Sequence, residues 1–227
     1  MNTYPIYLKL KDRKCVVAGG GAVARRKVRS LLDSGAMVEV ISPETGDELR
    51  AWAENEPLTI IADFYQPHHL DGAFLVVAAT DDRDVNRRIG ADARRNHILC
   101  NIVDDPELSD FIVPATARRG GIAVAVSTSG KSPALARRLK NWILQQLPES
   151  YVVLNEIMGT LRSHPALKQG TPSDHKELWD AILDSPILDK IAEGDAAGIE
   201  SLLSRIIGQK VTLEELKVNL HRGGLTE

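Results

Sequence analysis

The sequence predicts an α/β fold: a mostly parallel sheet covered by helices, then a small connecting segment and an all-helical C-terminal region. From residue 14 to about residue 127, short β-branched runs alternate with longer amphipathic stretches, a pattern typical of parallel strands joined by crossover helices. Most of these runs are apolar throughout, as strands covered on both faces require. Beyond residue 149 only amphipathic helical segments follow, so the last part of the chain is expected to be helical.

Each element is predicted from its own pattern and its boundaries. Strands are expected at residues 15–18, 37–41, 58–62, 74–79, 98–101, 111–113 and 122–126. Helices are expected at residues 22–34, 44–55, 82–96, 134–147, 151–162, 174–184 and 195–207. Gly35 closes the first helix as a C-terminal cap, and Pro148 ends the fourth.

Composition excludes several classes of protein. Of the 227 residues, 43% are hydrophobic and 26% are charged, which is typical of a folded globular chain and argues against disorder. The net charge of −3 provides no cationic field for nucleic acid or an anionic membrane, and no apolar run is long enough to span a bilayer. We therefore expect a cytoplasmic protein that binds neither. Cys15 and Cys100 lie in apolar runs and are expected to be buried thiols, not a disulfide.

The clearest chemical signal is a glycine-rich loop between the first strand and the first helix. Residues 19–24 read Gly-Gly-Gly-Ala-Val-Ala and fit the pattern G-x-G-x-x-A. Gly19 permits a tight turn, Gly21 lets the backbone approach a pyrophosphate, and Ala24 allows the helix to pack closely on the strand. The N–H groups and the dipole of the helix N-terminus favour an anion there. The sequence therefore predicts a Rossmann-like dinucleotide site.

One part of the dinucleotide pattern is missing. An acidic residue usually ends the second strand and binds the ribose hydroxyls, but here that strand ends in Ser42-Pro43. Glu39 stands about 20 residues after the glycines, yet inside the strand. No arginine follows directly to bind a 2′-phosphate, so the residues leave the choice between NAD and NADP open. Ser42 either contacts the ribose or only forms a turn.

Polar residues follow two further strands at the carboxyl edge of the sheet, where ligands of doubly wound folds bind. Thr80 and Asp81 end one strand and are expected to face the cofactor, although acidic residues there can equally cap the next helix. Asn101, Asp104 and Asp105 end another strand. One of these two carboxylates is a candidate general base.

Several short motifs follow one another along the chain in a specific order and at specific spacings. They are Pro5-Ile6-Tyr7 with Leu10, Gly19-Gly20-Gly21-x-Val23-Ala24-x-Arg26-Lys27, Ala79-Thr80-Asp81-Asp82 with Val85-Asn86, Cys100-Asn101-x-Val103-Asp104, Phe111-Ile112-x-Pro114-Ala115 and VSTSGKSP at 126–133. Together they resemble the dehydrogenase and chelatase module of sirohaem synthases, over essentially the whole chain. The resemblance implies oxidation of precorrin-2 to sirohydrochlorin with NAD as cofactor. Some members of the family also insert ferrous iron to give sirohaem.

The resemblance also implies roles for individual residues. Asp104 matches the catalytic aspartate of the family, implicated in both dehydrogenation and chelation. A single carboxylate beside the macrocycle suits both steps, because each of them removes a proton. Ala22 and Val23, with Ser42 and Pro43, match positions that contact NAD in relatives, where the acidic ribose ligand is usually missing.

The substrate implied by the resemblance is a tetrapyrrole rich in carboxylates. A basic cluster between the last strands and the next helix suits that charge, because guanidinium groups bind carboxylates in bidentate fashion. The cluster consists of Arg118, Arg119, Lys131, Arg137, Arg138 and Lys140. In the family, the loop around Thr128 lies by the substrate cleft, and a relative carries a phosphorylated serine there. The expected substrate contacts are Asn101, Arg118, Arg119, Thr128, Ser129 and Lys131.

The resemblance implies three parts: an NAD-binding domain at residues 1–113, a dimerisation and substrate-cleft segment at 114–148, and a helical domain at 149–227. Fused members continue into a methyltransferase domain, whereas this chain stops at Glu227, so a stand-alone form without methyltransferase activity is expected. A small helical part of this kind tends to pack on its own Rossmann domain or on a partner subunit, so a homodimer is expected. No pair of histidines has convincing ligand spacing, and no metal-binding residue is assigned. Two alternatives stay open: an enzyme that is also a ferrochelatase, and a non-catalytic NAD-sensing module.

Overall fold

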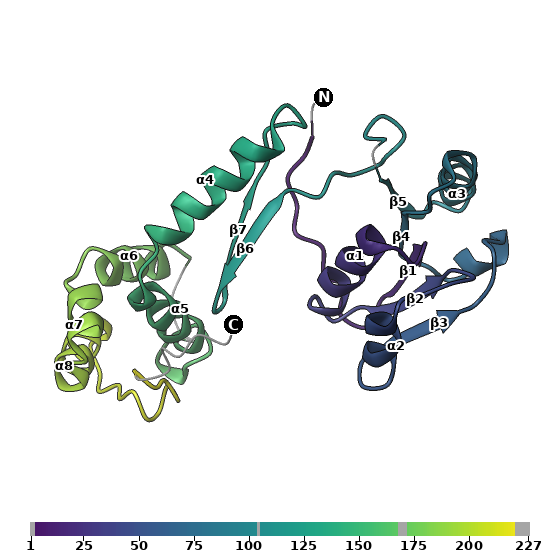
Figure 1. Cartoon of the computed structure of the whole chain (residues 1–227). Coiled ribbons are helices and arrows are strands. Elements are labelled where there is room, and N and C mark those ends of the chain that lie inside the picture. Colours follow the sequence, from purple (N-terminus) through teal and green to yellow (C-terminus); the bar gives the residue numbers. More distant parts are fainter. Residues whose placement is uncertain (1–2, 104, 168–171, 221–227) are drawn as a thin grey trace. The chain divides into compact units, whose positions relative to one another are not determined.

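The computed structural model describes residues 3–103, 105–167 and 172–220. The chain divides into two compact units, and the division falls between Val113 and Pro114 (Figure 1). The first unit holds a five-stranded sheet with its helices, and the second holds a two-stranded sheet and the remaining helices.

The sheet of the first unit is entirely parallel and has the strand order β3-β2-β1-β4-β5. Its strands are β1 (Lys14–Ala18), β2 (Met37–Ile41), β3 (Leu58–Ile61), β4 (Leu75–Ala78) and β5 (Leu99–Ile102). The strand order reverses direction at β1, because the chain first adds β2 and β3 on one side and then β4 and β5 on the other. Such a switch point opens a crevice for a ligand at the carboxyl ends of the central strands.

Helices cover both faces of this sheet. They are α1 (Ala22–Leu32), α2 (Asp47–Ala53), α3 (Arg83–Arg95) and the short 3₁₀ helix η1 (Pro67–Leu70). Cys15 and Val17 of β1 pack in one buried cluster with residues of α1 and α2, whereas Val16 and Ala18 pack in another with Ile89 of α3. Successive strand residues thus enter two separate cores, which explains the uninterrupted apolar runs.

The second unit begins with an antiparallel hairpin, β6 (Ala115–Arg119) and β7 (Ile122–Val126), on which α4 (Pro133–Gln145) packs. The rest is helical: α5 (Glu149–Leu161), η2 (Pro165–Leu167), α6 (Pro172–Leu183), α7 (Ile187–Glu193) and α8 (Ala196–Ile207). Its core includes Ile157, Ile182, Ile187, Ile199 and Leu203, all fully buried. The amphipathic segments predicted after residue 149 therefore form one helical core, to which α7 adds a helix that the sequence analysis missed.

The structure confirms the predicted fold class and corrects two of the seven strands. Residues 111–113 form no strand: the Asn101 amide holds the Phe111 carbonyl oxygen at 2.9 Å, so a side chain replaces the backbone ladder. The segment 122–126 is a strand, but it pairs with β6 in the separate hairpin. The prediction missed β6 because its Thr116, Arg118 and Arg119 do not form an apolar run.

The second helix is also shorter than predicted. It starts at Asp47 and not at residue 44, because the Ser42 hydroxyl donates a hydrogen bond of 2.6 Å to the Glu44 carbonyl oxygen and holds a turn there. Both cysteines are buried and free, as expected. Burial raises the pKa of the Cys15 thiol to about 11 and that of Cys100, aided by Asp110, to about 12.

Candidate dinucleotide site

The loop between β1 and α1 can hold only glycine at its first two positions. Gly19 has φ of +118°, and a Cβ there would lie 2.3 Å from the Ala79 carbonyl oxygen. A Cβ on Gly20 would lie 2.2 Å from the Glu44 carbonyl oxygen. The tight turn predicted at Gly19 is confirmed. The need for glycine at position 20 was missed, because the motif leaves that position unspecified.

Gly21 and the first turn of α1 present backbone N–H groups. Gly21 is the N-cap of α1, offers no side chain to cap it, and would place a Cβ in open space. The first intrahelical bond runs from the Arg25 N–H to the Gly21 carbonyl oxygen, so the N–H groups of Ala22, Val23 and Ala24 precede it. No acidic residue lies in the first turn. This helix end suits a phosphate.

The other helices at the same edge of the sheet carry acidic first turns. Asp82 caps α3 by accepting hydrogen bonds from the N–H groups of Asp84 and Val85, and Asp84 adds a second charge. Asp47 and Glu48 open α2. Of these three helices, α1 alone therefore has an N-terminus suited to an anion. Ala24 is fully buried and brings α1 close to the sheet, as predicted.

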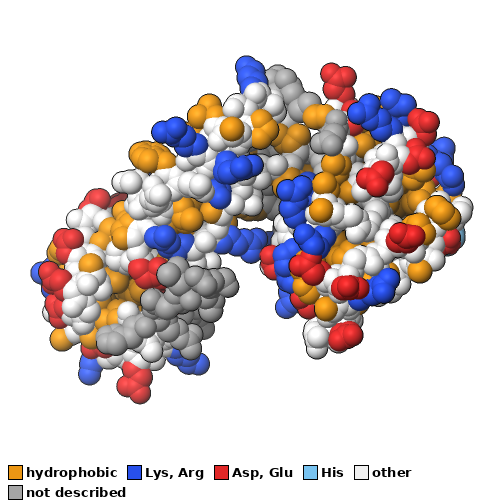
Figure 2. Space-filling model, viewed as in Figure 1, with side chains coloured by type: hydrophobic (Ala, Val, Ile, Leu, Met, Phe, Trp, Pro, Cys, Tyr) orange, Lys and Arg blue, Asp and Glu red, His pale blue; other side chains and the backbone are white. Residues whose placement is uncertain are grey.

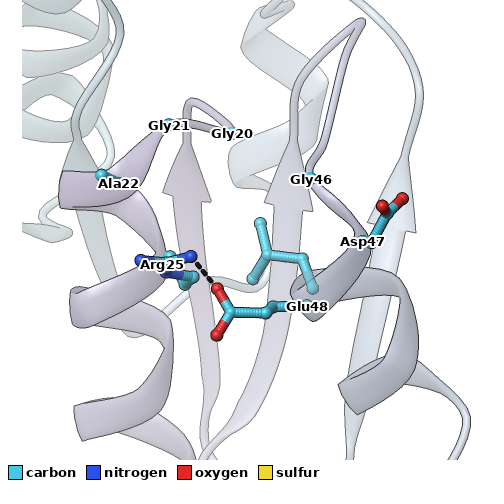
Figure 3. A pocket seen from close by; sticks show the side chains of 8 residues that line it. Gly20, Gly21, Ala22, Arg25, Gly46, Asp47 and Glu48 are labelled. Atoms are coloured by element: carbon cyan, nitrogen blue, oxygen red, sulfur yellow. Dashed lines mark ion pairs between the residues drawn. The ribbon is translucent and has the colours of Figure 1, made fainter.

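A cavity of about 370 Å³ opens between the glycine loop and α2 (Figure 3). Its lining consists of Gly20, Gly21, Ala22, Arg25, Gly46, Asp47, Glu48 and Leu49. Arg25 of α1 and Glu48 of α2 point toward each other and form an ion pair, whereas Asp47 points away from that pair. Arg25 and Glu48 could not be predicted from the sequence, because both lie outside the G-x-G-x-x-A motif at residues 19–24 and meet only through the fold.

Ser42 and Pro43 lie beside the loop but offer little to a ligand through their side chains. Ser42 is buried, its hydroxyl bonds to the Glu44 carbonyl oxygen, and its Oγ would stand 2.8 Å from a Cβ on Gly20. Pro43 is exposed. Of the two roles considered for Ser42, the structure shows the turn. A contact of either residue with the cofactor stays a prediction.

The turn after β4 is organised by Asn86, which the sequence analysis did not assign to the site. Its Oδ1 accepts from the Thr80 N–H at 3.1 Å and the Thr80 hydroxyl at 2.7 Å, and its Nδ2 donates to the Thr80 carbonyl oxygen at 2.9 Å. Asn86 is buried, so this turn is held rigidly. Asp81 is exposed beside it.

Asp104 lies outside the described residues. On either side of it, the Val103 N–H donates to the Ala78 carbonyl oxygen at 2.9 Å, and the Asp105 carboxylate accepts from the Leu108 N–H at 3.2 Å. Asp105 therefore serves the fold of its own loop. Asn101 is buried and bonds to the Phe111 carbonyl oxygen, while its Oδ1 lies 3.4 Å from Lys27 Nζ.

The remaining predicted residues belong to the second unit. The Thr128 hydroxyl accepts from the Ser132 N–H and donates to the Ser132 carbonyl oxygen, both at 3.0 Å, and closes the loop before α4. Ser129 in this loop has φ of +52°. Arg119 donates to the Leu147 carbonyl oxygen. Arg118 and Lys131 are exposed.

Two kinds of site find no support in the described ranges. No group of three or more His, Cys, Asp or Glu side chains there is arranged to hold a metal ion. None of the helices in these ranges is both long and apolar enough to cross a membrane.

Comparison with known proteins agrees with this geometry. Residues 6–115 match an NAD(P)-binding family, and residues 119–146 match the family of the sirohaem biosynthesis protein central domain. A siroheme synthase of Nitrosospira multiformis is 38% identical over 209 residues, which cover 90% of this chain and 44% of that protein. A siroheme synthase of Methylobacillus flagellatus is 35% identical over 224 residues, which cover 99% of this chain and 48% of that protein.

The chain spans about half the length of these curated relatives. The solved structure of SirC, a precorrin-2 dehydrogenase, is matched over almost its whole length. The match has a TM-score of 0.72 and 26% sequence identity, and it covers 90% of this chain and 98% of the SirC chain. The chain is similar to these sirohaem-biosynthesis proteins over nearly its whole length. The glycine loop and the cavity beside α2 lie within the residues that match the NAD(P)-binding family.

Proposed function

We propose that the protein is an NAD-dependent dehydrogenase that converts precorrin-2 to sirohydrochlorin. The observation that carries the proposal is a glycine loop with an uncapped α1 N-terminus, in a chain similar to a precorrin-2 dehydrogenase over 98% of that protein. The dehydrogenation removes two electrons and two protons from precorrin-2: one hydride goes to the cofactor and one proton to a base. NAD⁺, when bound, supplies the hydride acceptor.

The described residues fit the binding of a dinucleotide. The N–H groups of Ala22 and Val23 would donate to the pyrophosphate, with Gly19 and Gly21 keeping the loop free of side chains. The turn at Thr80 and Asp81, held by Asn86, lies at the end of β4 next to β1 and borders the same crevice. These residues bind and orient the cofactor and carry no proton.

We assign the proton transfer to Asp104. The neighbouring Asp105 is the other candidate for the general base, but its carboxylate already accepts a hydrogen bond from the Leu108 N–H. Removing a positioned base typically lowers a rate by about 10²- to 10⁴-fold. D104N should therefore lose NADH formation by about that factor while keeping its affinity for NAD⁺, whereas D105N should keep most of the activity. Equal activity of D104N and the unmodified protein would contradict the assignment.

The substrate-binding residues are proposed from charge. Lys131, in the same loop as Thr128 and Ser129, and Arg118, on β6, are exposed cations, and Figure 2 shows Lys and Arg side chains over β6, β7 and α4. Exposed guanidinium and ammonium groups suit a tetrapyrrole with many carboxylates. R118Q and K131Q should raise KM for precorrin-2 and leave the affinity for NAD⁺ unchanged. The hydrogen bonds of Asn101 and Arg119 within their own units favour a positioning role for these two.

We also propose that two copies of the chain associate through α4. Leu135, Leu139 and Trp142 are 48%, 39% and 59% exposed and recur at helical spacing on one face. Hydrophobic side chains are visible along α4 in Figure 2. A second copy that covers this stripe would remove it from water.

The two free, buried cysteines favour a reducing compartment such as the cytoplasm.

A second candidate activity is insertion of ferrous iron into sirohydrochlorin. The relatives named siroheme synthases favour it, because sirohaem is the iron-containing product. In this reaction Asp104 would accept the pyrrole protons, and the metal would be a substrate with no resident site. Anaerobic addition of Fe²⁺ to sirohydrochlorin with and without the protein tests it: catalysis requires conversion above the spontaneous rate.

A further inference from the structure

The second strand ends without the acidic residue that usually binds the ribose of a dinucleotide, yet the cavity beside it contains a carboxylate from another element. Ile41, Ser42 and Pro43 follow one another at the end of β2, and the Ser42 hydroxyl is engaged with Glu44. Glu48, from α2, reaches across the cavity to Arg25 (Figure 3). We propose that this Glu48–Arg25 ion pair selects NAD⁺ over NADP⁺. The inference rests on the proposed function and identifies the residues that set its cofactor preference.

The position of the adenosine ribose follows from the direction in which the dinucleotide runs along the sheet edge. With the pyrophosphate on the first turn of α1, the adenosine ribose points toward the end of the second strand. The cavity between the glycine loop and α2 occupies this place and is lined by Gly21 and Ala22 on one side and Gly46 on the other. Glu48 is therefore the carboxylate that can accept hydrogen bonds from the ribose 2′- and 3′-hydroxyls.

Charge explains why a 2′-phosphate would be rejected. The cavity lining carries one cation, Arg25, and two anions, Asp47 and Glu48. Arg25 is the only basic side chain of that lining, and its guanidinium is held by Glu48. A 2′-phosphate would meet the Glu48 carboxylate and find the guanidinium already engaged. The repulsion between the Glu48 carboxylate and a 2′-phosphate therefore gives selectivity mainly by weakening the binding of NADP⁺, and less by strengthening the binding of NAD⁺.

The side chains of the pair are 44% and 57% exposed, so the pair contributes little to folding and both residues can be replaced without loss of the fold. E48Q removes the repulsive charge and frees Arg25. R25Q leaves Glu48 alone in the cavity. The double variant R25Q/E48Q lacks both charges and tests whether any gain of NADP⁺ affinity depends on Arg25.

The experiment is calorimetric titration of the purified full chain and these variants with NAD⁺ and with NADP⁺. The unmodified protein should bind NAD⁺ at least about tenfold more tightly than NADP⁺. E48Q should lower the ratio of the dissociation constant of NADP⁺ to that of NAD⁺ by about 10- to 100-fold. This change is expected because the freed Arg25 can form a charge-assisted hydrogen bond to the 2′-phosphate and because the repulsion by Glu48 is lost. R25Q should show no gain for NADP⁺, and the double variant should lose most of the gain seen in E48Q.

Two substitutions serve as matched controls. E54Q removes an exposed acid at the other end of α2, and R87Q breaks an exposed Arg–Asp pair on α3, and neither residue lines the cavity. Both should leave the ratio unchanged. An E48Q ratio equal to that of the unmodified protein, or a preference of the unmodified protein for NADP⁺, would overturn the inference. With turnover of precorrin-2 intact, either result would leave the proposed dehydrogenation of precorrin-2 in place, and a preference for NADP⁺ would change only its cofactor. Absence of binding of both dinucleotides would overturn the inference and the proposed function together.

Discussion

Gly19 and Gly21 stand two residues apart in one loop, yet a side chain meets different surroundings at each. At Gly19 a Cβ would collide with the Ala79 carbonyl oxygen at a φ of +118°, whereas at Gly21 it would enter open space at a φ of −77°. We predict that G19A lowers the free energy of unfolding by about 1–3 kcal/mol or more, the cost of strained backbone. G21A should fold with nearly unchanged stability and lose affinity for NAD⁺. Urea denaturation and calorimetric titration of both variants check this, and equal stabilities would contradict it.

His69 provides a prediction about pH. It is buried, and its Nδ1 accepts the Gln66 N–H at 3.1 Å. Burial, and then the neighbouring His68, hold the pKa of His69 below its ordinary value of 6.5. The unfolded chain therefore binds a proton here more readily than the folded one, and stability is lost as the pH falls from 6.5 through the lower pKa of the folded state.

The test compares free energies of unfolding between pH 7 and pH 5 for the unmodified protein, H69Q and H68Q. H69Q should show a smaller loss over this range, because the titrating group is gone. His68 is exposed, and H68Q should retain most of the loss. If H69Q and the unmodified protein lose stability in parallel, His69 does not govern this part of the pH dependence.

At the scale of elements, the sequence was most informative where burial is strongest. The runs around Val17, Val40 and Val77 are apolar because helices cover both faces of the sheet, and all five parallel strands were predicted from this pattern. The hairpin was harder to predict. One face of β6 and β7 packs on α4 and the other, with Thr116 and Arg118, is exposed, so β6 shows no apolar run.

The exposed stripe of α4 provides a prediction about assembly. L139E places a charge within the stripe formed with Leu135 and Trp142, and should convert a dimer to a monomer because a buried, unpaired charge opposes association. N141E adds the same charge at an exposed position of the same helix outside the stripe and should leave the dimer intact. Light scattering coupled to size exclusion measures the mass. A monomeric unmodified protein, or a dimeric L139E, would contradict the role of α4.

At the scale of the whole molecule, the sequence predicts the residues of the glycine loop better than the side chains that line the cavity beside it. Gly19, Gly21 and Ala24 could be placed from the motif because each meets a local requirement of the loop. Arg25 and Glu48 could not, since they lie on different helices and are brought together by tertiary packing. Asn86 was visible as part of a motif, but its hydrogen bonds to Thr80 appear only once α3 is folded against β4.

The most direct test of the account is an anaerobic assay of the purified protein with precorrin-2 and NAD⁺, followed by the absorbance of NADH and the visible spectrum of the tetrapyrrole. We predict that NADH and sirohydrochlorin form together in equimolar amounts, and that omission of the protein abolishes both. Tight binding of NAD⁺ without any NADH formation from precorrin-2 would contradict the dehydrogenase and favour a non-catalytic NAD-sensing protein.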